Sequence, residues 1–335
     1  MSSVSVVVPL YNEEGNVCEL LRRIDTVMRT IEGLDGYEIV AVNDGSTDGT
    51  LERLRALRAE YPELAVISLS RNFGHQIAAT AGIDVAKGDA VILMDGDLQD
   101  PPELISEFVA KWREGYDVVY ATRRHRKGEN AFKLFTARAF YRVTKRLTKI
   151  SIPVDTGDFR LMSRRVVDAL GQTRERHRFL RGLVSWVGFR QVGIVYDRDA
   201  RYTGKTKYPF SKMLRFAIDG ITSFSEAPLR FATYFGFTVS LFAFAYAAIV
   251  LAFKLLDLNN PGYTSMMVAI LFLGGVQLIG IGILGEYVGR IYDEIKARPL
   301  YLISSIEPAG KGAAAESAQA AEKPEAPPGV RVLRN

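Results

Sequence analysis

The chain has 335 residues, of which 48% are hydrophobic, and it carries a formal net charge of +5. This composition supplies a full hydrophobic core and allows one large domain with attachments or two domains. The single cysteine, Cys18, excludes an intramolecular disulfide bond and is typical of a reducing compartment. Residues 1–3 lead directly into an apolar run, so we predict no signal peptide.

The first 121 residues alternate strand and helix signals. Apolar residues recur at three- and four-residue steps from Val17 to Ile31, as on one face of an amphipathic helix, and shorter helical patterns follow at 51–57 and 104–112. No G-x-G-x-x-G dinucleotide fingerprint follows the first predicted strand, and the chain has no P-loop motif. The alternation predicts an α/β fold with a mainly parallel sheet, whose ligands bind at the carboxyl ends of the strands. Short apolar runs typical of buried strands lie at residues 4–8, 38–42, 65–69, 90–94 and 117–121.

An acidic stretch, DGDLQD at residues 95–100, follows the fourth predicted strand. Carboxylates gathered at the end of a buried strand repel each other and lose solvation free energy. A hard divalent cation that bridges them to phosphate oxygens would offset both effects. The alternative is an acidic turn that caps the next helix, with Asp100 as the N-cap before Pro101. That alternative explains Asp100 but neither Asp95 nor Asp97.

A basic block follows the fifth predicted strand. Residues 122–150 hold ten Lys or Arg and one acid, Glu129. Such a block is typical of a surface for polyanions or anionic lipid. Apolar residues from Phe132 to Leu147 share one helical stripe, which favours a basic amphipathic helix at a membrane surface over a helix docked on the sheet. Residues 210–225 are a second candidate interfacial helix.

Two long uncharged runs lie in the last third of the chain. Residues 231–253 and 264–285 are each long enough to cross a hydrocarbon core of ~30 Å as a helix. The alternative, a pair of buried core helices, conflicts with the lack of a polar face. A short turn-forming connection predicts a hairpin, and the Lys and Arg on its outer flanks predict that both flanks are cytoplasmic. Gln277 lies within the second run, and its amide would form a hydrogen bond to another helix or subunit. The alternative is a tolerated amide that faces a partner helix.

Three motifs converge on one family. VPLYNEE at residues 8–14, NDGSTD at 43–48 and DGDLQDPP at 95–102 resemble the family 2 glycosyltransferases of GT-A fold. More narrowly, the chain resembles polyprenyl-phosphate glycosyltransferases of the GtrB type, the bactoprenol glucosyltransferases, which are relatives of dolichol-phosphate mannose synthase. The resemblance spans about residues 4–303. Motifs similar to this branch also lie at residues 157–162, 185–188, 273–277 and 285–292.

The resemblance implies a Rossmann-like GT-A domain on the cytoplasmic side of the membrane, followed by two C-terminal transmembrane helices. The last residues are rich in Ala, Glu, Pro and Gly and cannot build a core, so we predict a disordered tail. The predicted division is a nucleotide-sugar-binding core at 1–121, an acceptor-binding and juxtamembrane part at 122–230, transmembrane helices at 231–256 and 264–289, a cytoplasmic segment at 290–306 and the tail at 307–335.

The resemblance also implies a metal site in the acidic stretch. Asp97 and Gln99 would hold Mg²⁺ or Mn²⁺, with Asp95 as a further ligand nearer the nucleotide. The ion would stabilise the departing nucleoside diphosphate as a Lewis acid, which places Asp97 among the catalytic residues.

A donor site is implied beside it. Tyr11 would offer its ring to the base or sugar, and Asp44 would accept a hydrogen bond from the imide N–H of uracil. The structural alternatives are a helix start for the first motif, an Asx turn for the second and a solvated turn for the basic loop at residues 201–207. The implied donor-binding residues are Pro9, Tyr11, Asn12, Glu13, Asp44, Ser46, Asp95, Arg201, Lys205 and Lys207.

The implied acceptor is the phosphate group of a lipid. A sugar hydroxyl needs a general base, whereas a phosphate monoester, with a second pKa of about 6, is already largely dianionic at neutral pH. We therefore expect cations to hold two phosphate groups close together, with Arg123 and Arg138 on the acceptor phosphate. Asp158 would orient the acceptor or act as base, and Arg160 would pair with Asp158 or with phosphate. The alternative for these two catalytic candidates is a structural ion pair.

Together these inferences predict inverting transfer of a hexose, with glucose favoured, from a UDP-sugar to undecaprenyl phosphate at the cytoplasmic face of the inner membrane. The product would be a β-linked polyprenyl-phosphate sugar, and GDP-mannose or a modified pentose donor is the alternative. The predicted partners are the nucleotide sugar, the lipid, the membrane and further copies of the chain, up to the tetramer common in the family, but no nucleic acid. A processive synthase would carry a Q-x-x-R-W motif and more spans, and a non-catalytic membrane scaffold would have lost the acidic stretch.

Overall fold

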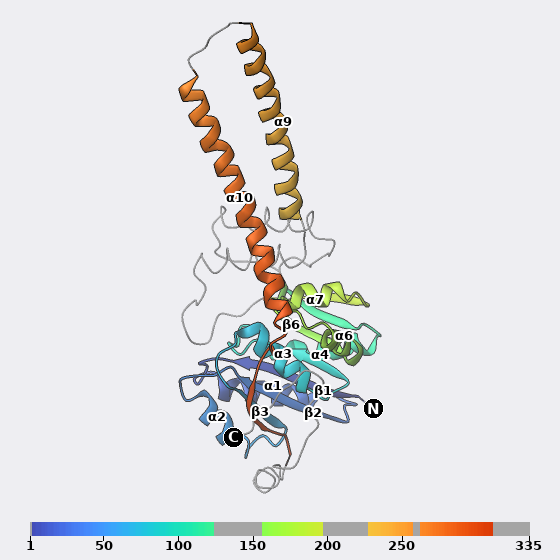
Figure 1. The fold of residues 1–335 in the computed structure, drawn as a ribbon. Coiled ribbons are helices and arrows are strands. Elements are labelled where there is room, and N and C mark those ends of the chain that lie inside the picture. The colour runs from blue at the N-terminus through green and yellow to red at the C-terminus, as the bar shows by residue number, and fades with distance from the viewer. Residues whose placement is uncertain (1, 124–155, 197–226, 257–261, 311–335) are drawn as a thin grey trace. The chain divides into compact units, whose positions relative to one another are not determined.

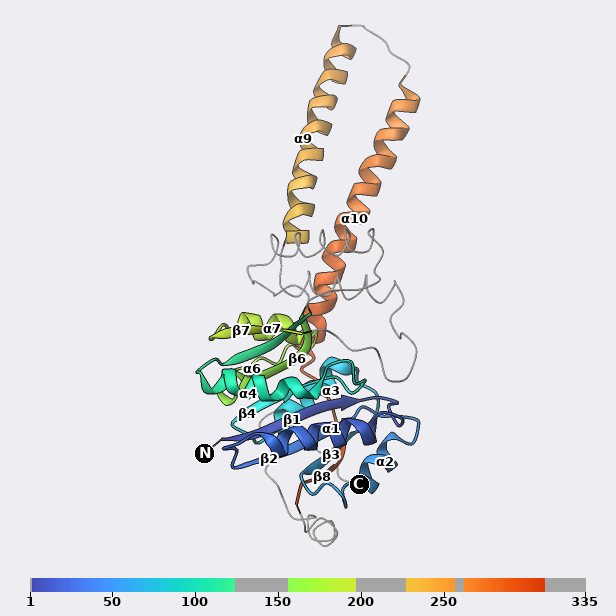
Figure 2. The ribbon, with the colours of Figure 1, turned by 180° about the vertical axis from the view of Figure 1, so that it is seen from behind.

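The computed structural model describes residues 2–123, 156–196, 227–256 and 262–310. The chain divides into two compact units. Of the described residues, 2–123, 156–196 and 298–310 belong to the sheet unit, and 227–256 with 262–297 belong to the hairpin unit. Figures 1 and 2 show the ribbon from opposite sides.

Eight strands form the sheet: β1 (Ser3–Leu10), β2 (Gly36–Asn43), β3 (Leu64–Leu69), β4 (Ala90–Leu93), β5 (Val118–Arg123), β6 (Thr156–Ser163), β7 (Gln191–Tyr196) and β8 (Ile303–Glu307). Their order is β7-β5-β6-β4-β1-β2-β3-β8. The strands β1 to β4 pair in parallel, whereas β6 is antiparallel to β4 and β5, and β8 is antiparallel to β3. The predicted mainly parallel α/β sheet is therefore confirmed, and all five predicted strands are present.

Helices cover both faces of this sheet. Alternate residues of a strand point to opposite faces. Accordingly Val4, Val6 and Val8 of β1 join the core that α1 and α4 close, whereas Val7 faces α3. A Cβ at Gly82 of α3 would lie 2.3 Å from Val7 Cγ1, so only glycine lets this helix approach the sheet so closely. The helices of the sheet unit are α1 (Val17–Thr30), α2 (Thr50–Leu57), α3 (His75–Val85), the 3-10 helix η1 (Pro102–Leu104), α4 (Ile105–Arg113), α6 (Arg164–Gln172) and α7 (Leu180–Trp186).

The strand order reverses at β1. The chain continues from β1 to β2 and β3 on one side, and β4 pairs with the other side of β1. In open α/β sheets such a reversal leaves a crevice at the carboxyl ends of the two strands, and ligands bind there. The motif after β1 and the acidic stretch after β4 both lie at this point.

The prediction that Asp100 caps the next helix is wrong. The 3-10 helix η1 begins after Pro101, which occupies the N-cap position itself in an extended conformation. Asp100 is fully buried, and its carboxylate accepts a hydrogen bond of 2.5 Å from the hydroxyl of Tyr196 at the end of β7. Because Pro101 separates Asp100 from the helix, the carboxylate turns into the sheet instead of toward helical N–H groups.

The hairpin unit consists of α9 (Ala227–Leu255) and α10 (Tyr263–Ile295). Two candidate membrane spans lie in these helices: Ala227–Phe253, with a mean hydropathy of 2.1, and Met266–Ile295, with a mean hydropathy of 2.4. In each span, none of the residues in the most apolar 18-residue stretch is buried by the rest of the protein. Apolar side chains exposed around a whole helix are what a lipid environment requires and water disfavours.

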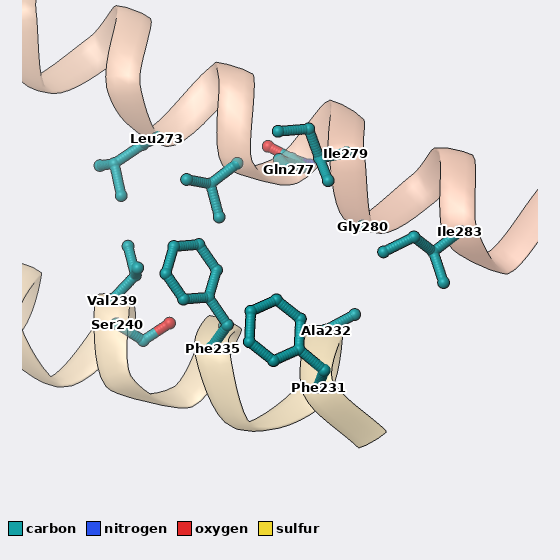
Figure 3. A pocket seen from close by; sticks show the side chains of 12 residues that line it. Phe231, Ala232, Phe235, Val239, Ser240, Leu273, Gln277, Ile279, Gly280 and Ile283 are labelled. Carbon is teal, nitrogen blue, oxygen red and sulfur yellow. The ribbon is translucent and has the colours of Figure 1, made fainter. Parts of the chain in front are cut away.

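An apolar cavity of about 360 Å³ lies between α9 and α10. Figure 3 shows Phe231 and Phe235 of α9 and Leu273 of α10 beside this space. Ser240 and Gln277 are the polar residues of its lining. The predicted bond of Gln277 to another helix or subunit stays a prediction.

The segment after α10 belongs to the sheet unit. The predicted cytoplasmic segment at 290–306 includes the last turns of α10 and most of β8, which pairs with the edge of β3. The sequence patterns do not predict β8, whose place in the sheet depends on its pairing with β3. The amphipathic helices predicted around 132–147 and at 210–225 lie outside the described residues.

Candidate active site

Two loops at the carboxyl edge of the sheet interlock, one after β1 and one after β2. The backbone N–H of Asn12 donates to Ser46 Oγ at 3.1 Å, and the N–H of Thr47 donates to Asn12 Oδ1 at 2.8 Å. The N–H of Glu13 donates to Thr50 Oγ1 at 3.0 Å. Asn12 has a φ of 54°, in the left-handed region that Asn tolerates better than most residues. Three predicted donor-binding residues are thus brought together by bonds that also hold the two loops in place.

Tyr11 stands at this edge with 39% of its surface exposed. It directly follows β1, in which Pro9 is buried opposite Val42 of β2. The proline ring fixes the φ angle of Pro9, two residues before the tyrosine. An exposed aromatic ring on a rigid strand end can stack on a nucleobase or a sugar.

Asp44 fixes the loop after β3. It is buried, and its two carboxylate oxygens accept the backbone N–H groups of Phe73 at 2.7 Å and Gly74 at 2.9 Å. Burial raises the pKa of the Asp44 carboxyl, although these two hydrogen bonds act in the opposite direction. The same loop packs closely on Gly45, where a Cβ would lie 2.5 Å from the carbonyl carbon of Arg71. The contact of Asp44 with uracil stays a prediction.

The acidic loop after β4 is a strained turn. Leu98 has a φ of 59°, a left-handed conformation that costs a residue with a side chain roughly 1–2 kcal/mol. Its side chain is buried in the hydrophobic core, which holds the turn in this conformation. Asp97 and Gln99 flank it, both half-buried, and the N–H of Gln99 donates to Asp97 Oδ1 at 3.2 Å. The buried leucine therefore keeps these two predicted metal ligands together at the end of β4.

The pairing of β4 with β6 brings Asp158 next to Asp95. Leu93 pairs with Arg160 in antiparallel register, so the continuation of this register places Asp95 opposite Asp158. Asp158 is 3% exposed. Two carboxylates at such close range need positive partners to remain ionised.

His75 and Arg181 supply these positive partners, and Gln76 adds a neutral hydrogen-bond donor. The Nε and Nη2 atoms of Arg181 donate to the two carboxylate oxygens of Asp158 at 2.8 and 3.3 Å. Gln76 Nε2 donates to Asp158 Oδ2 at 3.0 Å. His75 Nε2 lies 3.2 Å from Asp95 Oδ1 and 3.5 Å from Asp158 Oδ2. The imidazole therefore links the two carboxylates.

The charges of this cluster shift one another's pKa. Burial opposes ionisation of Asp158, but the guanidinium of Arg181 and the imidazole of His75 hold its pKa well below the usual range. Burial would lower the pKa of His75, yet Asp95 and Asp158 raise it well above its usual value. The pKa of Asp95 is lowered against burial, chiefly by His75. At neutral pH the cluster therefore consists of two carboxylates balanced by an imidazolium and a guanidinium.

Arg160 donates its hydrogen bonds to backbone carbonyls of β6, and the carboxylate of Asp158 lies farther away. Its Nη2 donates to the carbonyl of Gly157 at 2.9 Å and its Nε to the carbonyl of Asp158 at 3.3 Å. Its distance to Asp158 Oδ1 is 4.0 Å. Burial lowers the pKa of Arg160 to about 10, so the side chain still carries its charge at neutral pH. The alternative of an Asp158–Arg160 ion pair is thus a weak contact, and Arg181 is the principal cation on Asp158.

Two donor sets could hold a divalent cation. His75, Asp95 and Asp158 each offer a ligand atom, and these atoms lie within 4.8 Å of one another. Asp95 Oδ1 is buried and accepts no well-aligned hydrogen bond within the described residues, although His75 Nε2 lies 3.2 Å from it, so this oxygen keeps the capacity to meet a metal ion. The set predicted from the sequence, Asp97, Gln99 and Asp95, offers only oxygen atoms, the ligands that Mg²⁺ and Mn²⁺ prefer. Both sets contain Asp95.

Several predicted cations lie outside the described residues. They are Arg138, Arg201, Lys205 and Lys207. For Arg123 the structure describes the backbone at the end of β5 and not the side chain. The contacts of these residues with phosphate stay predictions.

The sequence patterns did not single out His75, Gln76 or Arg181. A signal existed for His75, which is one of three histidines and opens α3 just after a predicted strand. No local signal marks Arg181, because it meets Asp158 only through a tertiary contact between α7 and β6.

The chain matches the model of glycosyl transferase family 2 over residues 5–171 and that of the GtrB C-terminal hairpin over residues 227–291. It is 54% identical to an uncharacterized glycosyltransferase of Synechocystis sp. over 90% of this chain and 95% of that protein. It is 45% identical to the bactoprenol glucosyl transferase of Shigella phage SfX over 90% of this chain and 99% of that protein. Among solved structures, glucosyl-3-phosphoglycerate synthase from Mycobacterium tuberculosis is similar with a TM-score of 0.44 and 22% identity, over 66% of this chain and 79% of that one. The chain belongs to glycosyltransferase family 2, as an enzyme with a GtrB-type C-terminal hairpin.

Proposed function

We propose that the protein transfers glucose from UDP-glucose to a polyprenyl phosphate, with inversion, at the cytoplasmic face of a membrane. The observation that carries this proposal is the 45% identity to the phage bactoprenol glucosyl transferase over 90% of the chain. The similarity includes the hairpin as well as the sheet unit, so it covers the part of the protein that would lie beside a lipid acceptor.

In this proposal the donor lies along the carboxyl edge of β1, β2 and β4. Tyr11 stacks on the uracil ring, and the interlocked loops around Asn12 and Ser46 hold the uridine. The acidic loop with Asp95 then meets the pyrophosphate. The predicted basic loop at residues 201–207 would neutralise the remaining charge of the pyrophosphate.

We assign the divalent cation, Mg²⁺ or Mn²⁺, to Asp97 and Gln99, with Asp95 beside them. In the alternative set Asp158 already accepts hydrogen bonds from Arg181 and Gln76, and His75 Nε2 lies between the two carboxylates, whereas Asp97, Gln99 and Asp95 offer the oxygen ligands that these ions prefer. When bound, the ion supplies Lewis-acid stabilisation of the negative charge on the departing UDP.

The acceptor phosphate needs no general base, and Asp158 is poorly suited to be one. A carboxyl group whose pKa is held low binds a proton too weakly to act as an efficient base at neutral pH. Asp158 instead orients Arg181, while Arg123 and Arg138 hold the acceptor phosphate. A phosphate oxygen forms a bond to the anomeric carbon as the bond from that carbon to UDP breaks on the opposite face. An α-linked donor therefore gives a β-linked product.

We further propose that α9 and α10 cross the membrane as a hairpin with both flanks in the cytoplasm. β8 follows α10 in the chain, yet it belongs to the same sheet as β1, which precedes α9. Since both flanks of the hairpin enter one folded sheet, they lie on one side of the membrane. The excess of Lys and Arg on these flanks favours the cytoplasmic side. Assembly into a homo-oligomer, with a tetramer as the family form, stays a prediction.

The test is transfer of labelled glucose by the purified full chain in detergent. Undecaprenyl phosphate should become labelled by UDP-glucose, whereas undecaprenol, which lacks the phosphate, should not. EDTA should abolish the transfer, and Mg²⁺ or Mn²⁺ should restore it. NMR of the intact lipid product should show a β-linked sugar. Absence of transfer to the phosphate lipid, or an α-linked product, would contradict the proposal.

The sugar is tested in the same assay by a panel of donors. GDP-mannose and UDP-linked pentoses are supplied at the same concentration as UDP-glucose. Glucose should be transferred with the highest kcat/KM. Transfer from GDP-mannose alone would retain the acceptor assignment and overturn the donor assignment.

A further inference from the structure

The segment after α10 returns to the sheet unit as a strap, residues 298–308. Its β8 strand extends the edge of β3. Tyr301 of the strap is 4% exposed. The carboxylate of Glu307 accepts hydrogen bonds of 2.7 and 3.0 Å from Arg55 and Arg58 at the end of α2. The strap is thus built into the folded sheet unit, as the position of β8 beside β3 in Figure 2 also shows.

Tyr301 holds the C-terminal end of α3. Its hydroxyl donates to Asp84 Oδ2 at 2.7 Å, and Arg174, which lies just after α6, donates to the same oxygen at 2.6 Å. The side chain of Asp84 is 7% exposed and lies in the last turn of α3, where the helix dipole disfavours a negative charge. Burial and the charge of Asp84 raise the pKa of Tyr301, so the hydroxyl keeps the proton that it donates. The position of this carboxylate is therefore explained by its partners Tyr301 and Arg174, not by the helix that carries it.

The next residue of the strap, Leu302, holds the other end of the same segment. Its carbonyl accepts the N–H of Ser70 at 2.9 Å, and Ser70 is the first residue after β3. Ser70 and Asp84 enclose the loop and helix that carry His75 and Gln76. Two adjacent strap residues therefore secure both ends of the segment that places these side chains on the charge cluster.

We propose that the strap is a positioning element of the active site. Tyr301 and Asp84 are positioning residues, which hold α3 and thereby keep His75 and Gln76 against Asp158. The strap follows α9 and α10 in the chain, so the site is complete only when the segment beyond the hairpin has returned to the sheet. A chain that ends at the hairpin would lack this positioning element. For its transfer readout this inference rests on the proposed function.

The test compares two tyrosine variants of the full chain in detergent. Tyr301→Phe removes the hydrogen bond to Asp84. Tyr37→Phe is the matched control, because it removes a similar Tyr–Asp hydrogen bond, that to Asp25 at 2.5 Å, elsewhere in the sheet unit. Hydrogen–deuterium exchange of the peptide covering residues 70–76 is followed together with that of peptides from β1 and α1.

Tyr301→Phe should speed exchange at residues 70–76 by about tenfold or more, in line with the loss of one hydrogen bond to a charged acceptor. Exchange in β1 and α1 should stay at the wild-type rate. The transfer kcat should fall by a similar factor, because His75 and Gln76 are no longer held against Asp158. Tyr37→Phe should change neither the exchange at residues 70–76 nor kcat.

Wild-type exchange at residues 70–76 in Tyr301→Phe would overturn the inference. Equal acceleration in Tyr37→Phe would also overturn it, because it would show general loosening of the unit. The exchange measurement needs no substrate, so it decides the inference even if the wild-type chain transfers no glucose. That last result would refute only the proposed function.

Discussion

Replacement of Arg181 by methionine should unbalance the charge cluster of the active site. In the wild type two nitrogen atoms of Arg181 donate to the two carboxylate oxygens of Asp158 at 2.8 and 3.3 Å. Methionine keeps an apolar stem of similar length and removes both donors. The buried carboxylate is then left with Gln76 and His75 as partners.

The expected loss of stability follows from this geometry. Removal of one partner of a buried ion pair costs roughly 3–5 kcal/mol. The loss is smaller here because 26% of the Arg181 side chain is exposed and because Gln76 and His75 still contact Asp158. We expect the free energy of unfolding to fall by about 2–3 kcal/mol, which for a unit of this size lowers Tm by roughly 4–12 °C.

Thermal unfolding of the full chain in detergent, followed by circular dichroism, measures this difference. Arg22→Met is the control, since it breaks an exposed ion pair with Glu19 and should leave Tm unchanged. The double variant Asp158→Asn/Arg181→Met should recover most of the lost stability, because it contains no uncompensated buried charge. An Arg181→Met variant that unfolds at the wild-type temperature would refute the reasoning. A double variant with the summed loss of its two single variants would refute it too.

Three other predictions concern the metal, the packing of α3 and the pH dependence. Asp97→Asn should lower metal-dependent transfer by roughly 100-fold or more and leave Tm unchanged; retained transfer in a Mn²⁺ titration would exclude Asp97 as a ligand. Gly82→Ala should destabilise the chain by roughly 1–3 kcal/mol, because the added Cβ would collide with Val7 of the sheet. Gly171→Ala is the control and should not destabilise the chain, since no atom lies within 4 Å of its added Cβ. Equal Tm values for the two variants would contradict the close packing of α3. The pKa of Asp158 is lower in the folded chain than in the unfolded chain, where it is about 4, so the ionised carboxylate stabilises the fold above that pH, and this contribution is lost as pH falls through the folded pKa. Acid unfolding of Arg181→Met should therefore begin at a higher pH than in the wild type. An unchanged acid midpoint would count against the ion pair.

The regular part of the fold could be predicted because its elements bury regular stripes. Helix α1 buries six residues at three- and four-residue spacing, and β1 is buried along nearly its whole length. Strand β6 breaks such a pattern, since it buries the charged residues Asp158 and Arg160. Strand β8 was missed for a different reason. Its place in the sheet depends on pairing with β3, which lies more than 230 residues earlier in the chain.

The candidate site could be predicted only where its residues stand together in the sequence. The loops after β1 and β2 and the acidic loop after β4 are short runs, and parallel strands bring their ends to one edge. The family resemblance that these runs carried is confirmed by the family models and the relatives. The cap assigned to Asp100 failed because the sequence does not show that Tyr196 lies within hydrogen-bond distance of its carboxylate.

The sequence by itself determined the class of enzyme, the acidic loop and the two apolar helices, because short continuous runs of residues encode each of them. Only the tertiary structure decided which groups surround Asp158. Gln76 lies 82 residues before it and Arg181 lies 23 residues after it, and both reach it through the packing of α3 and α7. The ionisation of a buried carboxylate depends on the charges and donors within a few ångströms. Those neighbours are set by strand register and helix packing, which no local pattern contains.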